Sequence, residues 1–313
     1  MDSRKSLDLS AILMLVAICF IWAIQQIGLK ATADFAAPVL QLGLRSAIAA
    51  ILLWLVTQLR GQHIVLSGPL AAAGASAGVL FAIEFLLVGE SLRHTSASHV
   101  VVFLYTAPIF AAIGLHLKLP SERLAPFQWI GIAIASAGIA VAFFGGDSAT
   151  VSDLSSVLLG DALALAAGAA WGATTILIRT SGLAAIPAAH TLFYQLAVCG
   201  ALLTATAVIT GQADIVPSWQ LGANLAFQAI IVSLCSFLVW FWLLTRYVAS
   251  QMGVFSFMTP LFGVVLGFLL LDEPLTTEFI IGSAGVLAGI LIVSAYPWLT
   301  QKRISRAFSS PAE

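Results

Sequence analysis

The sequence predicts an all-α polytopic membrane protein, with ten transmembrane helices arranged as two inverted five-helix repeats. The 313-residue chain is 60% hydrophobic and only 9% charged, with a mean hydropathy of +1.04, whereas a soluble domain carries about 25% charged residues. Runs of roughly 20 apolar residues recur from end to end, and each is long enough to cross about 30 Å of hydrocarbon. Features of the first half also recur in the second half at a nearly constant offset.

The apolar runs are expected to be helices rather than strands. Strands of a membrane barrel would alternate apolar and polar residues over about ten positions, and these runs do not alternate. A helix also satisfies its own backbone hydrogen bonds in lipid. Short loops that carry Gly, Pro, Asp and Arg separate the ten expected spans, which are 10–29, 38–59, 70–91, 96–116, 127–145, 157–178, 188–209, 221–244, 250–271 and 278–298.

The internal repeat rests on three matched motifs. The first places an aromatic residue eight positions before a basic one, and its copies are offset by 171 − 22 = 149 residues. The other two motifs are a proline motif and a Glu…Gly…Gly block. The three pairs are Trp22 and Lys30 with Trp171 and Arg179, Thr106-Ala107-Pro108 with Met258-Thr259-Pro260, and Glu122…Gly131…Gly138 with Glu273…Gly282…Gly289. We expect one five-helix repeat in residues 1–146 and a second in 147–313, the latter with a cytoplasmic tail.

An odd number of spans in each repeat has a direct consequence for mechanism. The second repeat must enter the membrane from the opposite side, so the two copies are inverted. Inverted repeats allow two related conformations around one central site, as alternating access requires. Pro108 and Pro260 lie near the middles of matched spans, where proline should kink each helix. We interpret them as a pair of hinges, and a plain packing kink is the alternative.

The distribution of Lys and Arg predicts the orientation. If both termini are cytoplasmic, the cytoplasmic side holds ten of the 13 basic residues, the other side holds Lys30 and Arg93, and Arg45 lies within a span. The positive-inside rule favours this arrangement. The net charge of −1 gives no reason to expect a nucleic-acid partner, so the expected partners are the lipid bilayer and a small-molecule substrate.

Glycines in the fifth and tenth spans predict close helix packing. Gly131 and Gly138 are seven residues apart, as are Gly282 and Gly289, and small residues on one face let helices approach closely. We assign these spans to structure, with a homodimer contact as a further possibility.

Ionisable residues inside spans are the first pointer to function, because each costs a few kcal/mol at the centre of a helix. Arg45 and Glu84 are expected at the same depth, where an ion pair would reduce that cost. The pair could be structural, or a charged substrate or a proton could compete for one partner. His99 could titrate near neutral pH or simply bond to a neighbour. No His, Cys or carboxylate cluster has metal-binding spacing, so no metal or other cofactor is expected.

Aromatic residues with polar neighbours are the second pointer. They lie well inside spans of both repeats, and together they would line a central cavity suited to small amphipathic molecules. Aromatic residues facing lipid or the membrane interface are the alternative. The expected substrate-binding residues are Trp22, Gln26, Tyr105, Trp171, Thr175, Gln195, Trp240 and Phe257.

The three repeated motifs together resemble the drug/metabolite transporter superfamily, in its EamA-type bacterial branch, over nearly the whole chain. The resemblance implies an exporter of small metabolites in the bacterial inner membrane, with a central cavity between inverted halves. Within this branch the chain is most similar to YddG-type exporters of aromatic amino acids and drugs. The halves are not equivalent, because Arg45 and Glu84 align with Tyr194 and Ser236 in the second copy.

Two other functions are weighed beside an amino-acid exporter. A nucleotide-sugar or phosphorylated-metabolite carrier of the same fold would need a cluster of Lys and Arg in the cavity, and only Arg45 is clearly embedded. An intramembrane enzyme would need convergent catalytic groups at one depth, for which His99 and Glu84 could loosely qualify. We therefore expect no enzyme. The chain has no Walker-type loop, so ATP is not the direct driver.

Overall fold

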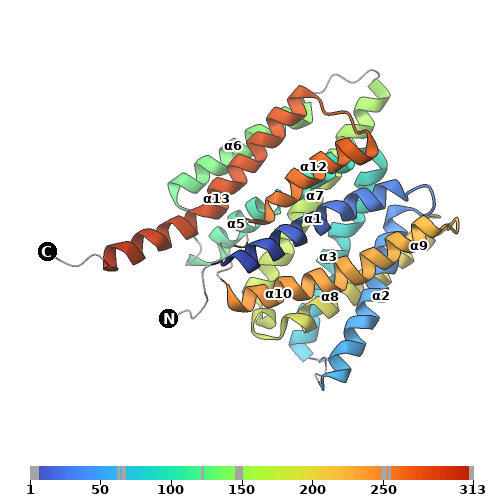
Figure 1. Cartoon of the computed structure of the whole chain (residues 1–313), viewed down its shortest axis with the longest axis horizontal. Coiled ribbons are helices and arrows are strands. Elements are labelled where there is room, and N and C mark those ends of the chain that lie inside the picture. The colour runs from blue at the N-terminus through green and yellow to red at the C-terminus, as the bar shows by residue number, and fades with distance from the viewer. Residues whose placement is uncertain are drawn as a thin grey trace.

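The computed structural model describes residues 7–61, 64, 68–120, 123–144, 151–247, 252 and 255–309. These residues form an all-helical bundle (Figure 1). An isolated antiparallel bridge joins Ala36 and Ile215. Glu122 and the expected boundary between residues 146 and 147 lie outside the described residues.

The helices follow the expected spans closely. The first half contains α1 (Leu9–Ala31), α2 (Pro38–Leu59), α3 (Gly68–His94), α4 (Ala97–Leu104), α5 (Ala107–Lys118) and α6 (Pro126–Phe144). The second half contains α7 (Val151–Thr180), the short 3₁₀ helix η2 (Gly182–Ala185), α8 (Ala188–Ile209), α9 (Trp219–Ala226), the π-helix η3 (Phe227–Ser236), α10 (Phe237–Arg246), α12 (Met258–Leu271) and α13 (Thr277–Ser309).

Eight helical segments of the described chain are at least 18 residues long and apolar enough to cross a membrane. The protein is therefore a multi-pass membrane protein. Two further apolar stretches, Pro126–Ala142 and Met258–Leu271, overlap the fifth and ninth expected spans. Neither stretch is among the eight segments.

Both expected hinge prolines stand just after a break in a helix. Tyr105 and Thr106 form a turn between α4 and α5, and Pro108 occupies the second position of α5. This early position suits proline, because the first residues of a helix lack intrahelical partners for their N–H groups. In the second half a turn at Phe257 precedes α12, and Pro260 is its third residue. The breaks give each proline a local structural basis, and their role as hinges stays a prediction.

The eighth expected span departs from regular α-helix. Ten of its residues, Phe227–Ser236, form the π-helix η3 between α9 and α10. Such wide turns are rare and often occur at functional sites. The π-helix was not predicted, because its residues belong to an apolar run like those of the other spans.

The two halves of the chain interleave. In the first half, α3 packs against α7 and α8 of the second half, while α2 packs against α8 and α1 against α12. Helix α1 begins and α13 ends at the same end of the bundle (Figure 1).

The paired glycines pack α6 against α13 within one chain, and these two helices lie side by side along one edge of the bundle (Figure 1). A Cβ atom added at Gly131 would lie 2.8 Å from the carbonyl oxygen of Gly289, and Gly138 faces Gly282 in the same way. These glycine faces are used inside the monomer, and a homodimer contact stays a prediction.

Replacing Gly138 by alanine is expected to destabilise the protein. The added Cβ would lie 2.5 Å from the backbone nitrogen of Val286 and 2.6 Å from the carbonyl oxygen of Gly282. These backbone atoms cannot rotate away, so α6 and α13 must separate. Overpacking of this kind costs about 1–3 kcal/mol, and Gly138→Ala should lower the Tm of the purified protein in detergent.

Gly222→Ala is the matched control, because a Cβ at this helical glycine would meet nothing within 4 Å. Alanine favours helix over glycine by up to about 1 kcal/mol, so the Tm should stay constant or rise. An equal fall in Tm for both variants would contradict the glycine-mediated contact.

Candidate functional site

A cavity of about 230 Å³ lies where helices of the two halves meet, and we call it the central cavity. Helices α1, α3 and α4 line it from the first half, and α7, α8 and α10 from the second. Its described lining residues are Trp22, Gln25, Gln26, Phe81, Glu84, Phe85, Leu104, Tyr105, Trp171, Thr174, Thr175, Ile178, Leu192, Gln195, Phe237, Trp240 and Ser256.

The structure brings most of the expected substrate-binding residues together. Trp22, Gln26, Tyr105, Trp171, Thr175, Gln195 and Trp240 all line the central cavity. Phe257 does not; its side chain packs in the apolar core, and the neighbouring Ser256 lines the cavity instead. Phe257 forms the turn before α12, so extrapolating a continuous helix through this point misplaced its side chain.

The aromatic walls are held in place by mutual contacts. Trp22 donates a 2.8 Å hydrogen bond from Nε1 to Ser236 Oγ, and its ring centroid lies 5.2 Å from that of Trp240. Tyr105 and Trp171 meet edge to face at 5.3 Å between centroids. Such pairs favour a defined geometry, so the walls present fixed aromatic surfaces from both halves.

Three polar side chains of the cavity lack protein partners. Within the described part of the chain, no hydrogen bond reaches the carboxyl group of Glu84 or the side-chain amides of Gln26 and Gln195. Glu84 is only 4% exposed and Gln26 only 2%. Buried polar groups in folded proteins are normally hydrogen-bonded, so these groups call for a functional explanation.

The expected direct ion pair between Arg45 and Glu84 is wrong. Arg45 is 2% exposed, and its Nη1 donates to Gln25 Oε1 at 2.7 Å and to Gln228 Oε1 at 2.6 Å. Its guanidinium also covers the ring of Phe85, 4.5 Å from the centroid. Two amide oxygens and a ring face take the place of the carboxylate, and Gln228 reaches Arg45 from the π-helix η3, which the sequence did not reveal.

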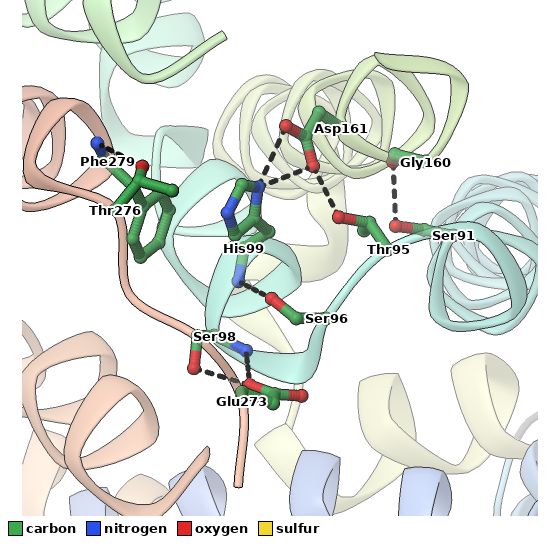
Figure 2. Close-up of polar contacts among 10 residues, drawn as sticks. All are labelled: Ser91, Thr95, Ser96, Ser98, His99, Gly160, Asp161, Glu273, Thr276 and Phe279. Carbon is green, nitrogen blue, oxygen red and sulfur yellow. Dashed lines mark hydrogen bonds and ion pairs between the residues drawn. The ribbon is translucent and has the colours of Figure 1, made fainter. Parts of the chain in front are cut away.

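His99 belongs to a second polar group, which we call the α4 cap cluster: Thr95, Ser96, Ser98, His99, Asp161 and Glu273 (Figure 2). His99 Nδ1 lies 2.9 Å from both carboxyl oxygens of Asp161, and its ring stacks on Phe279 at 3.9 Å between centroids. Thr95 Oγ1 donates a 2.8 Å bond to the same carboxylate. His99 therefore bonds to a neighbour and does not line the central cavity.

Glu273 binds the amino end of α4. Its carboxylate accepts hydrogen bonds from Ala97 N at 2.6 Å, Ser98 N at 3.0 Å and Ser98 Oγ at 2.6 Å. A carboxylate at this position satisfies free N–H groups and complements the helix dipole. At the neighbouring end of α3, the Lys30 ammonium donates to the carbonyl oxygens of Leu92 and Thr95.

The α4 cap cluster joins the two halves of the chain. Thr95 and His99 belong to the first half, whereas Asp161, Glu273 and Phe279 belong to the second. Asp161 was not among the predicted site residues. Its carboxylate lies inside the expected span 157–178, and an ionisable residue at such a position indicates a structural or functional role. Glu273 was assigned only to a repeat motif, and its partners could not be known without the packing of α12 and α13.

Two other hollows lie outside the central cavity. A groove of about 640 Å³ between α2 and α8 is lined by apolar and small residues around Trp54 and Phe193. A pocket of about 310 Å³ at one end includes Asp34 and Arg93. Neither is lined by a buried ionisable group without a partner among the described residues, so the central cavity is the stronger candidate site despite its smaller volume.

A family model described as the EamA-like transporter family matches the chain twice, over residues 9–144 and 158–295. The repeat therefore coincides with two copies of one family domain. The two matches together extend over nearly all of the expected spans.

Relatives and one solved structure agree with this match. The uncharacterized transporter YoaV of Bacillus subtilis (strain 168) is 22% identical over 283 residues, which cover 89% of this chain and 94% of YoaV. An uncharacterized transporter of Archaeoglobus fulgidus is 27% identical over 288 residues, covering 87% and 94%. A crystal structure with 18% identity superposes with a TM-score of 0.65 over 92% of this chain and 98% of the other, and at this identity the likeness shows the fold alone.

Asp161→Ala is expected to destabilise the protein by about 1–3 kcal/mol, because it removes the acceptor for the buried Thr95 hydroxyl and for His99. Thermal unfolding in detergent measures the effect. Asp214→Ala removes an exposed carboxylate of the same type and should leave the Tm unchanged. Equal Tm values for the two variants would show that the α4 cap cluster does not hold the halves together.

Proposed function

The chain belongs to the EamA-like transporter family, and we propose that it is a secondary exporter of small metabolites that works by alternating access. The proposed substrates are amino acids, including aromatic ones, and amphipathic drugs, as in YddG-type exporters. The proposed location is the bacterial inner membrane, with both termini in the cytoplasm. Family membership and transporter-named relatives point to a transporter rather than an enzyme.

The proposed topology has ten crossings in two inverted repeats. It takes the shorter apolar helices α6 and α12 as crossings beside the eight long segments. Two copies of one family domain, each with a helix break before a proline, support this arrangement. An odd number of crossings per copy would invert the second copy, which is the geometry that alternating access uses.

The observation that carries the proposal is the composition of the central cavity. Aromatic rings from both halves surround it, and Glu84, Gln26 and Gln195 offer hydrogen-bonding groups that no described residue uses. A mostly apolar pocket with a few convergent polar groups is the usual form of a small-molecule site. Placement between the halves suits a site that opens to either side as the halves move.

The alternative functions receive less support from this geometry. The described lining contains no Lys or Arg, whereas a nucleotide-sugar or phosphorylated-metabolite carrier would need cations for its anionic substrate. His99 and Glu84 do not line a common cavity, so they do not form the convergent catalytic pair that an intramembrane enzyme would need.

Purified protein in liposomes is expected to catalyse counterflow of aromatic amino acids, and Thr175→Phe should reduce that flux at least about tenfold, because the added ring fills much of a small binding cavity. Thr180→Phe is the matched control on the same helix. Both hydroxyls donate to the carbonyl oxygen four residues earlier, but Thr175 lines the cavity and Thr180 is exposed.

The assay covers a panel of amino acids, amphipathic drugs and sugar nucleotides, each with and without a pH gradient. If the protein transports sugar nucleotides and no other member of the panel, the proposed substrate class is wrong. Absence of flux for every member of the panel, in protein that is folded by its Tm, would refute the proposal.

A further inference from the structure

We propose that Glu84 and Gln26 form a binding subsite for the ammonium group of a substrate within the central cavity. The inference rests on the proposed transport function and deepens it, because it states which end of an amphipathic molecule this chain recognises. It predicts that a positively charged amine is required, whereas a carboxylate on the substrate is not.

Glu84 is the first element of the subsite. It lies on α3, lines the central cavity and is 4% exposed, and Oε2 has no partner. A carboxylate left without hydrogen bonds in an apolar surrounding is costly. An ammonium group carries three donors and a positive charge, so it would satisfy the carboxylate with charge-assisted hydrogen bonds.

Gln26 adds an oriented acceptor. Its Oε1 is buried without a partner, and the side chain lines the same cavity from α1. Two unpartnered acceptors of one cavity, Glu84 Oε2 and Gln26 Oε1, match a ligand group that donates several hydrogen bonds. A ligand carboxylate would add a further acceptor to this set and would be repelled by an ionised Glu84.

A buried polar network near α2 shows how side chains with a structural role are satisfied within the bundle. Thr32 Oγ1 donates to Gln41 Oε1 at 2.9 Å, and the Gln41 amide donates to the carbonyl oxygens of Thr32 and Ala36. Asn224 donates to Gln41 at 2.8 Å and joins this network from α9. Every side chain of this network has a partner, whereas Glu84 Oε2 has none.

Arg45 offers Glu84 no direct bond. Its Nη1 is bound by the amide oxygens of Gln25 and Gln228, and its guanidinium is covered by Phe85. The arginine thus places a positive charge in the same buried region, which partly offsets the burial of a carboxylate. Glu84 therefore lines the cavity with a carboxyl oxygen that has no protein partner, which a cationic ligand could supply.

The aromatic walls favour the same ligand. Trp22, Tyr105, Trp171 and Trp240 line the cavity, and aromatic ring faces attract cations within about 6 Å. Among the described lining residues, Glu84 is the single formally charged side chain. The Glu84 carboxylate and the aromatic ring faces together favour a ligand in which a cationic group is attached to an apolar or aromatic portion.

Three matched probes test the subsite by equilibrium binding to the full chain in lipid nanodiscs: phenethylamine, phenylalanine and 3-phenylpropionate. All three carry the same ring. The first carries only the ammonium group, the second both charges and the third only the carboxylate. We expect the first two to bind wild-type protein at least about tenfold more tightly than the third, as a charge-assisted hydrogen bond implies.

Glu84→Gln keeps the shape of the side chain and removes its charge. It should raise the Kd of phenethylamine about 10–100-fold. The Kd of 3-phenylpropionate should stay the same or fall. Glu90→Gln is the control, because Glu90 lies on the same helix but bonds to Arg93 and Gln212 away from the cavity. It should leave all three affinities unchanged.

Equal affinities of the three probes for wild-type protein would overturn the subsite, and that comparison does not depend on the folding of any variant. An unchanged phenethylamine Kd in Glu84→Gln would overturn it as well, because glutamine has no negative charge and keeps only one of the two acceptor oxygens. Failure of all three probes to bind also contradicts the subsite. The proposed transport function is decided separately by flux of the wider panel.

Discussion

In hydrocarbon, a polar group must find its hydrogen-bond partner inside the protein, since lipid offers none. Buried polar residues of the bundle meet this constraint to different degrees. Arg45, Gln41 and Asp161 have partners on neighbouring helices and hold the two halves together. Glu84 and Gln26 have unpartnered oxygens and line the central cavity. In our proposal, a bound ligand supplies the missing hydrogen-bond partners there.

The two halves match the same family domain but contribute different residues to the helix contacts and to the cavity. The glycine pairs make the contact between α6 and α13, one helix from each half. The cavity carboxylate Glu84 comes from the first half alone, at a position where the second copy has Ser236, whose hydroxyl accepts the Trp22 indole N–H. One copy therefore supplies charge at the site, and the other supplies a neutral group that fixes an aromatic wall.

Much of the fold was predictable from the sequence, because apolar runs and repeated motifs are local signals. The expected spans coincide with helices where the chain is described, and seven of the eight expected binding residues line one cavity. The partners of Arg45 and His99 were not predictable. They depend on the π-helix that carries Gln228 and on the packing of α7 against α4, and both arise from contacts between distant segments.

The central claim, that the cavity opens alternately to the two sides of the membrane, is tested most directly by labelling Thr175→Cys with a membrane-impermeant thiol reagent. A background without the exposed Cys235 avoids competing reaction. In oriented vesicles, the account predicts labelling from either side and protection by a bound aromatic amine from both. Labelling confined to one side under all conditions, or labelling that substrate leaves unchanged, would contradict it.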